Sequence, residues 1–589
     1  MNKSEKPSYL KIFFRSLGLI FKSAPTKVTF LMIILALQIF IPVVQATAIA
    51  KFIDSVKTLS DIKSAILIML PFIIAVLIDF LVGPLMMIVQ GECTDSLVKK
   101  VNMDLFNKVS EVDNLNTLDN PEFYDRLNML QMEIAFRPIN LIVFSFSIIR
   151  IFVTIVVMFA QLSAYSVWIP LAFLVGIFPQ SYIVYKLQVA AYENTVTRSP
   201  FVKQLNYYRD ILLGRDFSKE RVVFKYGDKF KEDYDEIIDR INGESAKDRR
   251  KKGLAGVLVS IFGVVVLSIT IVLFVKNVVA GIYTIGALSL FLNYLLYTAR
   301  SSIRFIEEGS MLLETELFMN TYFEFLDFDF NMASGDSNCN DVNKIEFKNV
   351  SFKYPGRDDY ALENVSFDFF DFNVGDRLGI VGVNGSGKTT IMKLLLRLYD
   401  ADSGQILING KDIKEYDIDE LRSSFGVLFQ DFNKYEITFR ENVELSNINK
   451  NSKNDLAQSI HRSGADSVLK KFGNNMETHL GKIYNDGVEI SGGEWQRIAT
   501  ARTLYHGGNV LIFDEPTSAL DPIQEKVFWE NLLEDSNIRS AIFTTHRIQG
   551  LRRATKFIVL DAGKVVEEGS FDELMNANGK FFELFNAQN

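Results

Sequence analysis

The chain has 589 residues, too many for one hydrophobic core, which predicts three or four domain-sized units, or fewer where segments lie in lipid. Aromatic residues make up 12% and charged residues 23%, yet mean hydropathy is positive, which indicates a membrane part joined to a soluble part. The net charge of −8 argues against nucleic acid as a partner, and only Cys93 and Cys339 are present, which excludes a disulfide framework.

Apolar runs in the first half of the chain predict six membrane-spanning helices. A span needs about 20 mostly apolar residues, and buried soluble helices seldom repeat such lengths. A basic segment, residues 1–27, precedes the first run, so we expect a retained span with the N-terminus in the cytosol. The sixth run is short, and its helix should continue through Arg300 and Arg304. The runs are 28–50, 64–90, 140–164, 167–187, 254–279 and 285–297.

The connections between these runs predict the domain organisation. Those after the second and fourth runs are long, charged and helical in pattern, so helices should project into the cytosol. We expect a membrane domain at 1–316, a polar linker at 317–343 and a domain of alternating strands and helices at 344–589. The predicted fold class is therefore an all-α transmembrane domain followed by an α/β domain with a largely parallel sheet.

Two ionisable residues, Asp79 and Arg150, interrupt apolar runs, and such residues are functional candidates. Both lie at similar depth from the outer ends of their spans, so we hypothesise that they pair or both face a central cavity. A purely structural pair that fixes helix register is an equally good alternative. Weaker cavity candidates, which could also join helices, are Gln38, Gln45, Gln161, Asn293 and Tyr297.

Residues 382–389 match the phosphate-binding pattern G-x-x-x-x-G-K-S/T between an apolar run and an amphipathic stretch. Glycines there let backbone N–H groups surround phosphate oxygens, Lys388 can reach the terminal phosphates, and the Thr389 hydroxyl can bind Mg²⁺. We therefore expect a phosphate-bearing ligand and Mg²⁺, and the family resemblance described next implies that the ligand is ATP. The candidate nucleotide-binding residues are Gly382, Val383, Asn384, Gly385, Ser386, Gly387, Lys388, Thr389 and Thr390.

Two later motifs carry a family resemblance. Residues 510–515, Val-Leu-Ile-Phe-Asp-Glu, form an apolar strand that ends in two acids, and residues 490–497 read Ile-Ser-Gly-Gly-Glu-Trp-Gln-Arg. With the P-loop, they resemble the ATPase domain of ABC transporters, and the second motif matches the signature that other P-loop families lack. An acidic pair alone could equally be a structural cap. The resemblance implies that Asp514 holds Mg²⁺ through water and that Glu515 polarises the attacking water.

The signature implies a dimer. Its Ser491, Gly492 and Gly493 amides would meet the γ-phosphate of a nucleotide bound to the opposite subunit, so two domains would enclose two nucleotides head to tail. Glu494 occupies the position where the family usually has Gln. Because an acid beside a triphosphate is unfavourable, we expect Glu494 to point away or to pair with a base.

Four more positions match the family. Tyr354 corresponds to the aromatic residue that stacks on adenine, although it could simply end a strand, and Gln430 corresponds to the Q-loop residue that senses Mg²⁺ and the attacking water. Asp521 lies in the D-loop, which crosses the dimer interface, and His546 matches the switch histidine at the γ-phosphate. The resemblance covers nearly the whole chain and implies a competent ATPase.

A fused membrane and ATPase domain resembles an exporter half-transporter, and the details resemble bacterial lantibiotic and multidrug exporters. Coupling helices are then expected at 119–125 and 212–217. The implied function is alternating-access export of an amphipathic peptide, drug or lipid across the bacterial cytoplasmic membrane, with the ATPase domain in the cytosol. Its partner would be a second half-transporter, the same chain or a related one. A lipid flippase and an ATP-gated channel or regulator are the alternatives.

Overall fold

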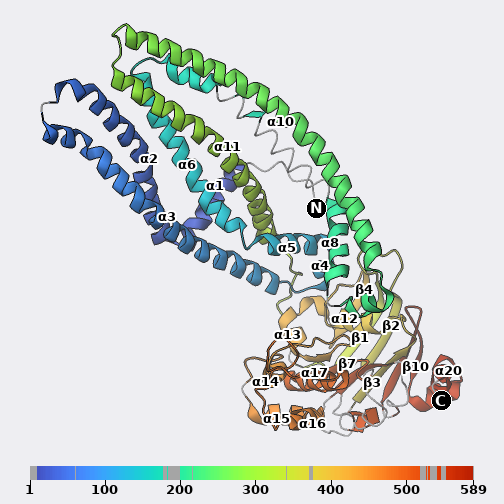
Figure 1. Cartoon of the computed structure of the whole chain (residues 1–589). Coiled ribbons are helices and arrows are strands. Elements are labelled where there is room, and N and C mark those ends of the chain that lie inside the picture. Colours follow the sequence, from blue (N-terminus) through green and yellow to red (C-terminus); the bar gives the residue numbers. More distant parts are fainter. Residues whose placement is uncertain are drawn as a thin grey trace. The chain divides into compact units, whose positions relative to one another are not determined.

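The computed structural model describes residues 9–587 and divides the chain into two compact units (Figure 1). The helical unit contains residues up to Val109 and Asp125–Asp329, and the α/β unit contains Ser110–Tyr124 and Phe330–Asn589. The residues outside the description are 1–8, 60, 177–178, 180–181, 184–198, 215, 340, 371–375, 451, 518–524, 527, 531–539, 546–551, 553 and 588–589.

The helical unit consists of long helices because its sequence contains apolar stretches that are longer than those of most buried helices in soluble proteins. Within this unit, α11 packs against α2 and α6, and α10 packs against α8. The helices whose bounds lie within the described residues are α1 (Tyr9–Ser23), α2 (Pro25–Ser55), η1 (Val56–Thr58), α3 (Ile62–Ser110), α5 (Pro121–Glu133), α6 (Arg137–Ser163), α8 (Ser199–Leu213), α9 (Ser218–Phe224), α10 (Gly227–Val279) and α11 (Ile285–Asp327).

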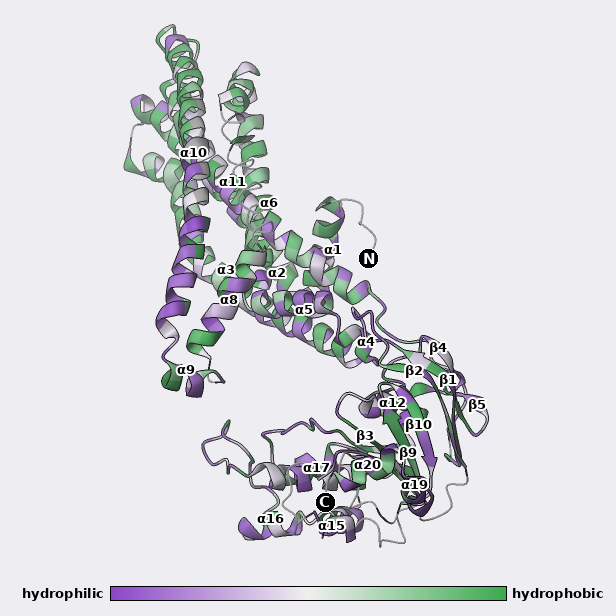
Figure 2. Cartoon of the chain, turned by 90° about the vertical axis from the view of Figure 1, so that its right-hand side faces the viewer, coloured by the Kyte–Doolittle hydropathy of each residue, from purple (hydrophilic) through white to green (hydrophobic). Residues whose placement is uncertain are grey.

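Four segments among the described residues are long and apolar enough to cross a membrane. They are Pro25–Thr58, Ile62–Ser110, Arg137–Ser163 and Gly256–Val279. Large apolar side chains of α3, such as Leu67, Phe80 and Leu81, are exposed, which suits contact with lipid. Figure 2 shows α10 changing from hydrophilic near its start to hydrophobic toward its end. The helical unit is therefore a membrane unit with polar extensions.

The remaining two predicted spans differ in outcome. The fourth, 167–187, falls partly outside the described residues, although 168–176 are helical. The sixth forms the start of α11, which is not among the four segments above. As predicted, this helix continues through Arg300 and Arg304.

The predicted linker at 317–343 begins too early, because α11 continues to Asp327. Polar residues there alternate with a buried apolar face that includes Phe318, Tyr322 and Phe325, so the segment is an amphipathic helix. Its end is held by Arg15, whose guanidinium donates two hydrogen bonds to Asp327 at 2.6 and 2.7 Å. The predicted boundaries also missed Ser110–Tyr124, which groups with the α/β unit.

The described residues of the α/β unit form two sheets. One is antiparallel, in the order β2-β1-β4-β5; the other has the order β10-β9-β3-β8-β7-β6, with only β10 antiparallel to its neighbour. The strands are β1 (Lys344–Phe352), β2 (Leu362–Phe370), β3 (Asp376–Gly382), β4 (Ser403–Ile408), β5 (Lys411–Asp412), β6 (Phe425–Leu428), β7 (Val510–Asp514), β8 (Ser540–Thr545), β9 (Lys556–Asp561) and β10 (Lys564–Gly569).

Alternate residues of the parallel strands enter two different cores, as the two-residue period of a strand requires. Ile512 and Ile542 join a core shared with β1 and β2, while Phe513 and Phe543 join a second core on the other face. The helices of this unit are α4 (Leu115–Leu118), α12 (Lys388–Leu395), η2 (Ile413–Glu415), α13 (Ile418–Ser423), α14 (Phe439–Glu444), α15 (Lys453–Arg462), α16 (Asp466–Lys471), α17 (Gly492–His506), α19 (Phe571–Ala577) and α20 (Lys580–Asn586).

Parallel pairing of β3, β6, β7 and β8 places their carboxyl ends at one edge of the sheet. The loop after β3 carries the phosphate-binding pattern, β7 ends at Asp514, and Gln430 follows β6 by two residues. Ligand sites of open α/β sheets form at such an edge. The fold therefore brings distant motifs together at one position.

Candidate active site

The loop between β3 and α12 has the backbone of a phosphate cradle. Gly385 and Gly387 have φ of +81° and +106°, a region that glycine adopts without steric cost. The Lys388 ammonium donates to the carbonyl oxygens of Gly382 and Val383 at 3.0 and 3.1 Å. Among the described residues, the buried Ser386 Oγ has no hydrogen-bond partner. The backbone N–H groups of this loop, the Ser386 hydroxyl and the Lys388 ammonium can therefore donate hydrogen bonds to phosphate oxygens.

A hydroxyl and a carboxylate lie together beneath this loop. Thr389 Oγ1 donates to Asp514 Oδ2 at 2.8 Å, and Thr544 Oγ1 donates to Oδ1 of the same carboxyl group. Burial raises the pKa of Asp514 because it disfavours the charged carboxylate. A hydroxyl with a carboxylate is the oxygen donor set that suits Mg²⁺, so Thr389 and Asp514 fit this metal.

Glu515, the next residue, lies beside both the Q-loop residue and the P-loop lysine. Gln430 Nε2 donates to Glu515 Oε2 at 2.8 Å, and the Lys388 ammonium lies 3.8 Å from Glu515 Oε1. Glu515 has φ of +47°, which is strained for a residue with a side chain and is typical of functional positions. Burial lowers the pKa of Lys388, while the neighbouring carboxylates Glu515 and Asp514 oppose this shift.

Lys388, Thr389, Gln430 and Glu515 line one cavity of about 410 Å³. Tyr354 lines it as well, and its hydroxyl lies 3.0 Å from Thr390 Oγ1 at the start of α12. Arg357 and Tyr360 also line this cavity but were not predicted from the sequence. Their positions soon after Tyr354, as a basic and an aromatic residue, could have indicated a role in nucleotide binding. The cavity offers an aromatic wall for a base and a cationic loop for phosphates.

The signature lies outside this cavity, because Ser491, Gly492, Gly493 and Glu494 are absent from its lining. Ser491 caps α17, and Glu494 completes a capping box: Glu494 Oε2 accepts hydrogen bonds from the Ser491 backbone N–H and hydroxyl, both at 2.8 Å. Oε1 of Glu494 pairs with Lys471. The expectation that Glu494 pairs with a base is confirmed.

Two predicted site residues, Asp521 and His546, fall outside the described residues. Their roles therefore stay predictions. By contrast, Thr544 was not predicted, yet it contacts Asp514 through its hydroxyl and accepts the Glu515 backbone N–H at its carbonyl, 3.1 Å away. Its only sequence signal was its place two residues before the predicted switch histidine.

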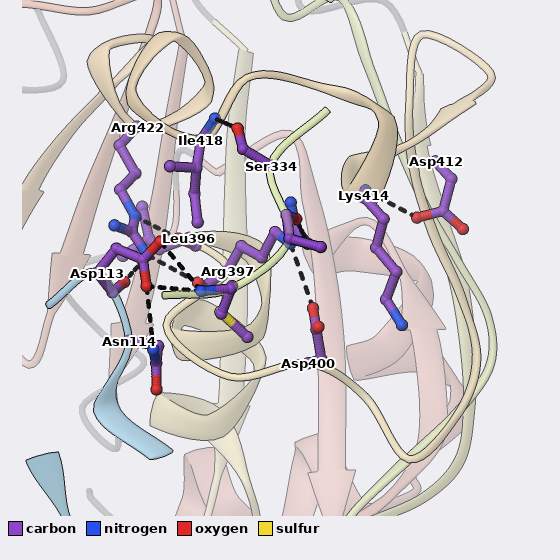
Figure 3. Close-up of polar contacts among 12 residues, drawn as sticks. Asp113, Asn114, Ser334, Leu396, Arg397, Asp400, Asp412, Lys414, Ile418 and Arg422 are labelled. Carbon is purple, nitrogen blue, oxygen red and sulfur yellow. Dashed lines mark hydrogen bonds and ion pairs between the residues drawn. The ribbon is translucent and has the colours of Figure 1, made fainter. Parts of the chain in front are cut away.

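The segment Ser110–Tyr124 docks onto residues that directly follow α12 (Figure 3). Arg422 donates to the carbonyl oxygens of Asp113 at 2.5 Å, Arg397 at 2.8 Å and Leu396 at 3.1 Å. Asn114, in turn, donates to the Phe330 carbonyl at 2.6 Å. Arg422 therefore holds this segment to the end of the P-loop helix.

Two further contacts connect the same segment to the nucleotide cavity. The Leu115 N–H donates to the Leu398 carbonyl at 2.9 Å, and the Tyr399 hydroxyl donates to the Asp119 carboxylate. The Tyr399 ring then packs edge-on against Tyr354, with 5.4 Å between centroids. The first predicted coupling segment, 119–125, thus begins at this contact. The second predicted coupling segment, 212–217, includes residue 215, which is not among the residues that the structure describes.

A phosphate cradle, an oxygen donor pair for a divalent cation and a poised carboxylate define a nucleotide-hydrolysing P-loop domain fused to a membrane unit. Residues 362–518 match the family model described as ABC transporter. The chain is 28% identical to the subtilin transport ATP-binding protein of Bacillus subtilis, over 93% of this chain and 89% of that protein. It is 27% identical to the nisin transport ATP-binding protein of Lactococcus lactis subsp. lactis, over 97% and 95%.

A solved structure of a bacterial Atm1-family ABC exporter with ATP bound has the same fold, with a TM-score of 0.78 over 96% of this chain and 98% of that one, at 21% identity. The chain thus contains an ABC transporter domain, and its fused membrane and ATPase parts give it the organisation of an exporter-type half-transporter. It is a membrane protein whose ATPase domain binds ATP and couples hydrolysis to transport, and half-transporter organisation implies dimerisation.

Proposed function

We propose that this chain exports an amphipathic peptide across the bacterial cytoplasmic membrane, as one half of a pair, with its ATPase domain in the cytosol. The observation that carries the proposal is a polar and aromatic cavity of about 490 Å³ inside the helical unit, lined by α2, α3, α6 and α11. Similarity to the subtilin and nisin transport proteins over most of the chain supports a peptide as cargo.

In this proposal, the residues of the α/β unit have distinct tasks. The P-loop amides and Lys388 bind and orient the phosphates, and Tyr354 positions the base. Gln430 holds the carboxylate of Glu515, which accepts a proton from the attacking water. Thr389 and Asp514 would hold Mg²⁺, which would supply charge neutralisation. Positioning and charge neutralisation account for most of the catalysis of phosphoryl transfer, and the described residues provide both.

The position of the signature supports head-to-tail pairing. Because the start of α17 does not line the chain's own nucleotide cavity, the backbone N–H groups of Gly492 and Gly493 are available to a nucleotide held by a second subunit. Asp521 and His546 would complete the interface and the γ-phosphate contact. The second half is another copy of this chain or a related half-transporter, and activity of the purified chain alone distinguishes the two.

Peptide uptake tests the proposal directly. The purified chain is reconstituted in liposomes with ATPase domains outward, and ATP-dependent accumulation of a fluorescent amphipathic peptide is measured. We expect accumulation that Glu515→Gln abolishes and that Glu583→Gln, which changes an exposed carboxylate on α20, preserves. Accumulation of a fluorescent lipid in the opposite leaflet without peptide uptake would contradict peptide export and indicate a flippase.

A further inference from the structure

The cavity of the helical unit has an uneven charge. Its lining includes three arginines, Arg150, Arg300 and Arg304, and a single carboxylate, Asp79. Asp79 and Arg150, which interrupt the apolar runs, therefore line the same cavity, as one form of our hypothesis expected. Asp79 and Arg150 form no ion pair in the described structure. A site with excess positive charge inside a membrane unit calls for a compensating group of negative charge.

Arg150 has only neutral partners among the described residues. Its Nη1 donates to Gln38 Oε1 at 3.2 Å, its Nη2 lies 3.5 Å from Ser147 Oγ, and its buried Nε has no partner there. Arg150 is half-buried, and a half-buried guanidinium with only neutral partners loses hydration that no carboxylate offsets. Gln38 holds the guanidinium in place, which leaves donors for another group.

α11 presents a ladder of polar residues to the same cavity. Asn293, Tyr297, Arg300 and Arg304 follow one another at intervals of four, three and four residues, so they share one helical face. At about 1.5 Å per residue the ladder spans roughly 16 Å. No ion pair involves Arg300 or Arg304 in the part of the chain that the structure describes. Both arginines are exposed, so this face of α11 presents two positive charges one turn apart.

We propose that this cavity binds the carboxylate groups of an acidic amphipathic peptide, an inference that rests on the peptide export proposed above. The planar guanidinium groups of Arg150, Arg300 and Arg304 match carboxylates in bidentate geometry. Phe72 and Tyr297 supply aromatic surface for the apolar side chains of the same peptide.

The distribution of the lining favours a peptide over a lipid. Polar side chains enter the cavity from all four helices, namely Gln38 and Gln45 from α2, Asp79 from α3, Arg150 from α6 and Arg304 from α11. An acyl chain needs a continuous apolar wall, whereas a peptide backbone can hydrogen-bond to amides such as Gln38 and Gln45.

Equilibrium binding to the full chain in phosphatidylcholine nanodiscs tests this inference. Three fluorescent peptides of one amphipathic sequence are compared, in which the polar positions carry Glu, Gln or Lys. Because a charge-assisted hydrogen bond adds to the binding free energy, we expect the Glu peptide to bind about tenfold more tightly than the Gln peptide. The Lys peptide should bind most weakly. Asp79→Asn should tighten binding of the Glu peptide, because it removes the one negative charge of the lining.

The paired substitution Arg300→Gln with Arg304→Gln should reduce the preference for the Glu peptide to about twofold or less. Arg209→Gln, which changes an exposed arginine on α8, should preserve the preference. Equal binding of the three peptides to the unaltered chain would overturn the inference without any variant, and so would an unchanged preference in the paired variant.

Two further measurements distinguish a failure of the acidic preference from a failure of the proposed peptide export. If liposomes accumulate the Gln and Lys peptides as well as the Glu peptide, export stands and the acidic preference is wrong. If no peptide accumulates, peptide export itself fails. Displacement of the bound Glu peptide by phosphatidylglycerol, without any preference among the peptides, would show that a lipid headgroup occupies the cavity and would overturn the proposal.

Discussion

Glu494 stands where a glutamine is usual in the signature, and the structure gives the replacement a physical reason. Its carboxylate caps α17 and pairs with Lys471 on α16. Although burial raises the pKa of Glu494, hydrogen bonds from Lys471 and Ser491 lower it to about 2. The negative charge is thus neutralised within the domain and is no obstacle to a nucleotide.

Glu494→Gln should destabilise the chain by about 1–2 kcal/mol at pH 7, because Gln keeps the cap but loses the charged pair. Since the folded-state pKa lies below the ordinary 4.5, the stabilisation is present above about pH 4.5 and is lost as the pH falls toward 2. Thermal unfolding of both proteins at several pH values measures this. A gap in unfolding temperature that does not narrow below pH 4.5 would contradict the assignment.

Among the individual site residues, those in local motifs could be predicted from the sequence, whereas their long-range contacts could not. Lys388, Thr389, Asp514 and Glu515 could be named from the sequence, because strand, glycine loop and acidic pair each leave a local pattern. The pairing partner Lys471 lies 23 residues from Glu494, and nothing in the sequence marks it among the other lysines.

Helix α12 connects the nucleotide cavity to the segment Ser110–Tyr124. Its first residues, Lys388 and Thr389, belong to the P-loop, and residues just beyond its end contact Asp113, Leu115 and Asp119. At about 1.5 Å per residue, its eight residues span roughly 12 Å, so it is a short rigid link. The sequence predicted a coupling segment here by family position, but could not show that Arg422 and Tyr399 hold it.

Tyr399→Phe should therefore weaken coupling without changing ATP affinity. The ring still packs against Tyr354, while the hydrogen bond to Asp119 is lost, which predicts a two- to tenfold fall in peptide-stimulated hydrolysis. Tyr416→Phe is the matched control, because it removes a buried hydroxyl contact to the Ile408 carbonyl elsewhere in the domain. A rise in KM for ATP with unchanged stimulation would contradict this account.

The start of α11 depends on a glycine. The Gly286 N–H and the Thr284 hydroxyl both donate to Asp54 at the end of α2, each at 2.7 Å. A Cβ on Gly286 would lie 2.2 Å from the Ala50 carbonyl oxygen, so the helices could not stay this close.

Gly286→Ala should consequently cost about 1–3 kcal/mol, because the added methyl group overpacks the contact between α2 and α11. Thermal unfolding in detergent measures the loss. Gly18→Ala, in α1, has no atom within 4 Å of its added Cβ and should be neutral or slightly stabilising. Equal stability of the two variants would show that the helix contact relaxes without cost.

At the scale of the whole molecule, hydropathy predicted a membrane part and an α/β part because both patterns extend over many residues. Boundaries were less predictable: the polar surface of residues 317–327 suggested a linker, whereas their buried apolar face makes them part of α11. The grouping of Ser110–Tyr124 with the α/β unit depends on contacts with residues near 398 and 422, which no local pattern indicates.

We propose that this chain hydrolyses ATP through Glu515 to drive export. The most direct measurement is Mg²⁺-dependent ATP hydrolysis by the purified chain in lipid nanodiscs, beside Glu515→Gln and Glu583→Gln. We predict hydrolysis that an amphipathic peptide stimulates, that Glu515→Gln reduces by at least about 100-fold while ATP binding persists, and that Glu583→Gln leaves intact. Hydrolysis by Glu515→Gln at more than a tenth of the original rate would contradict the account.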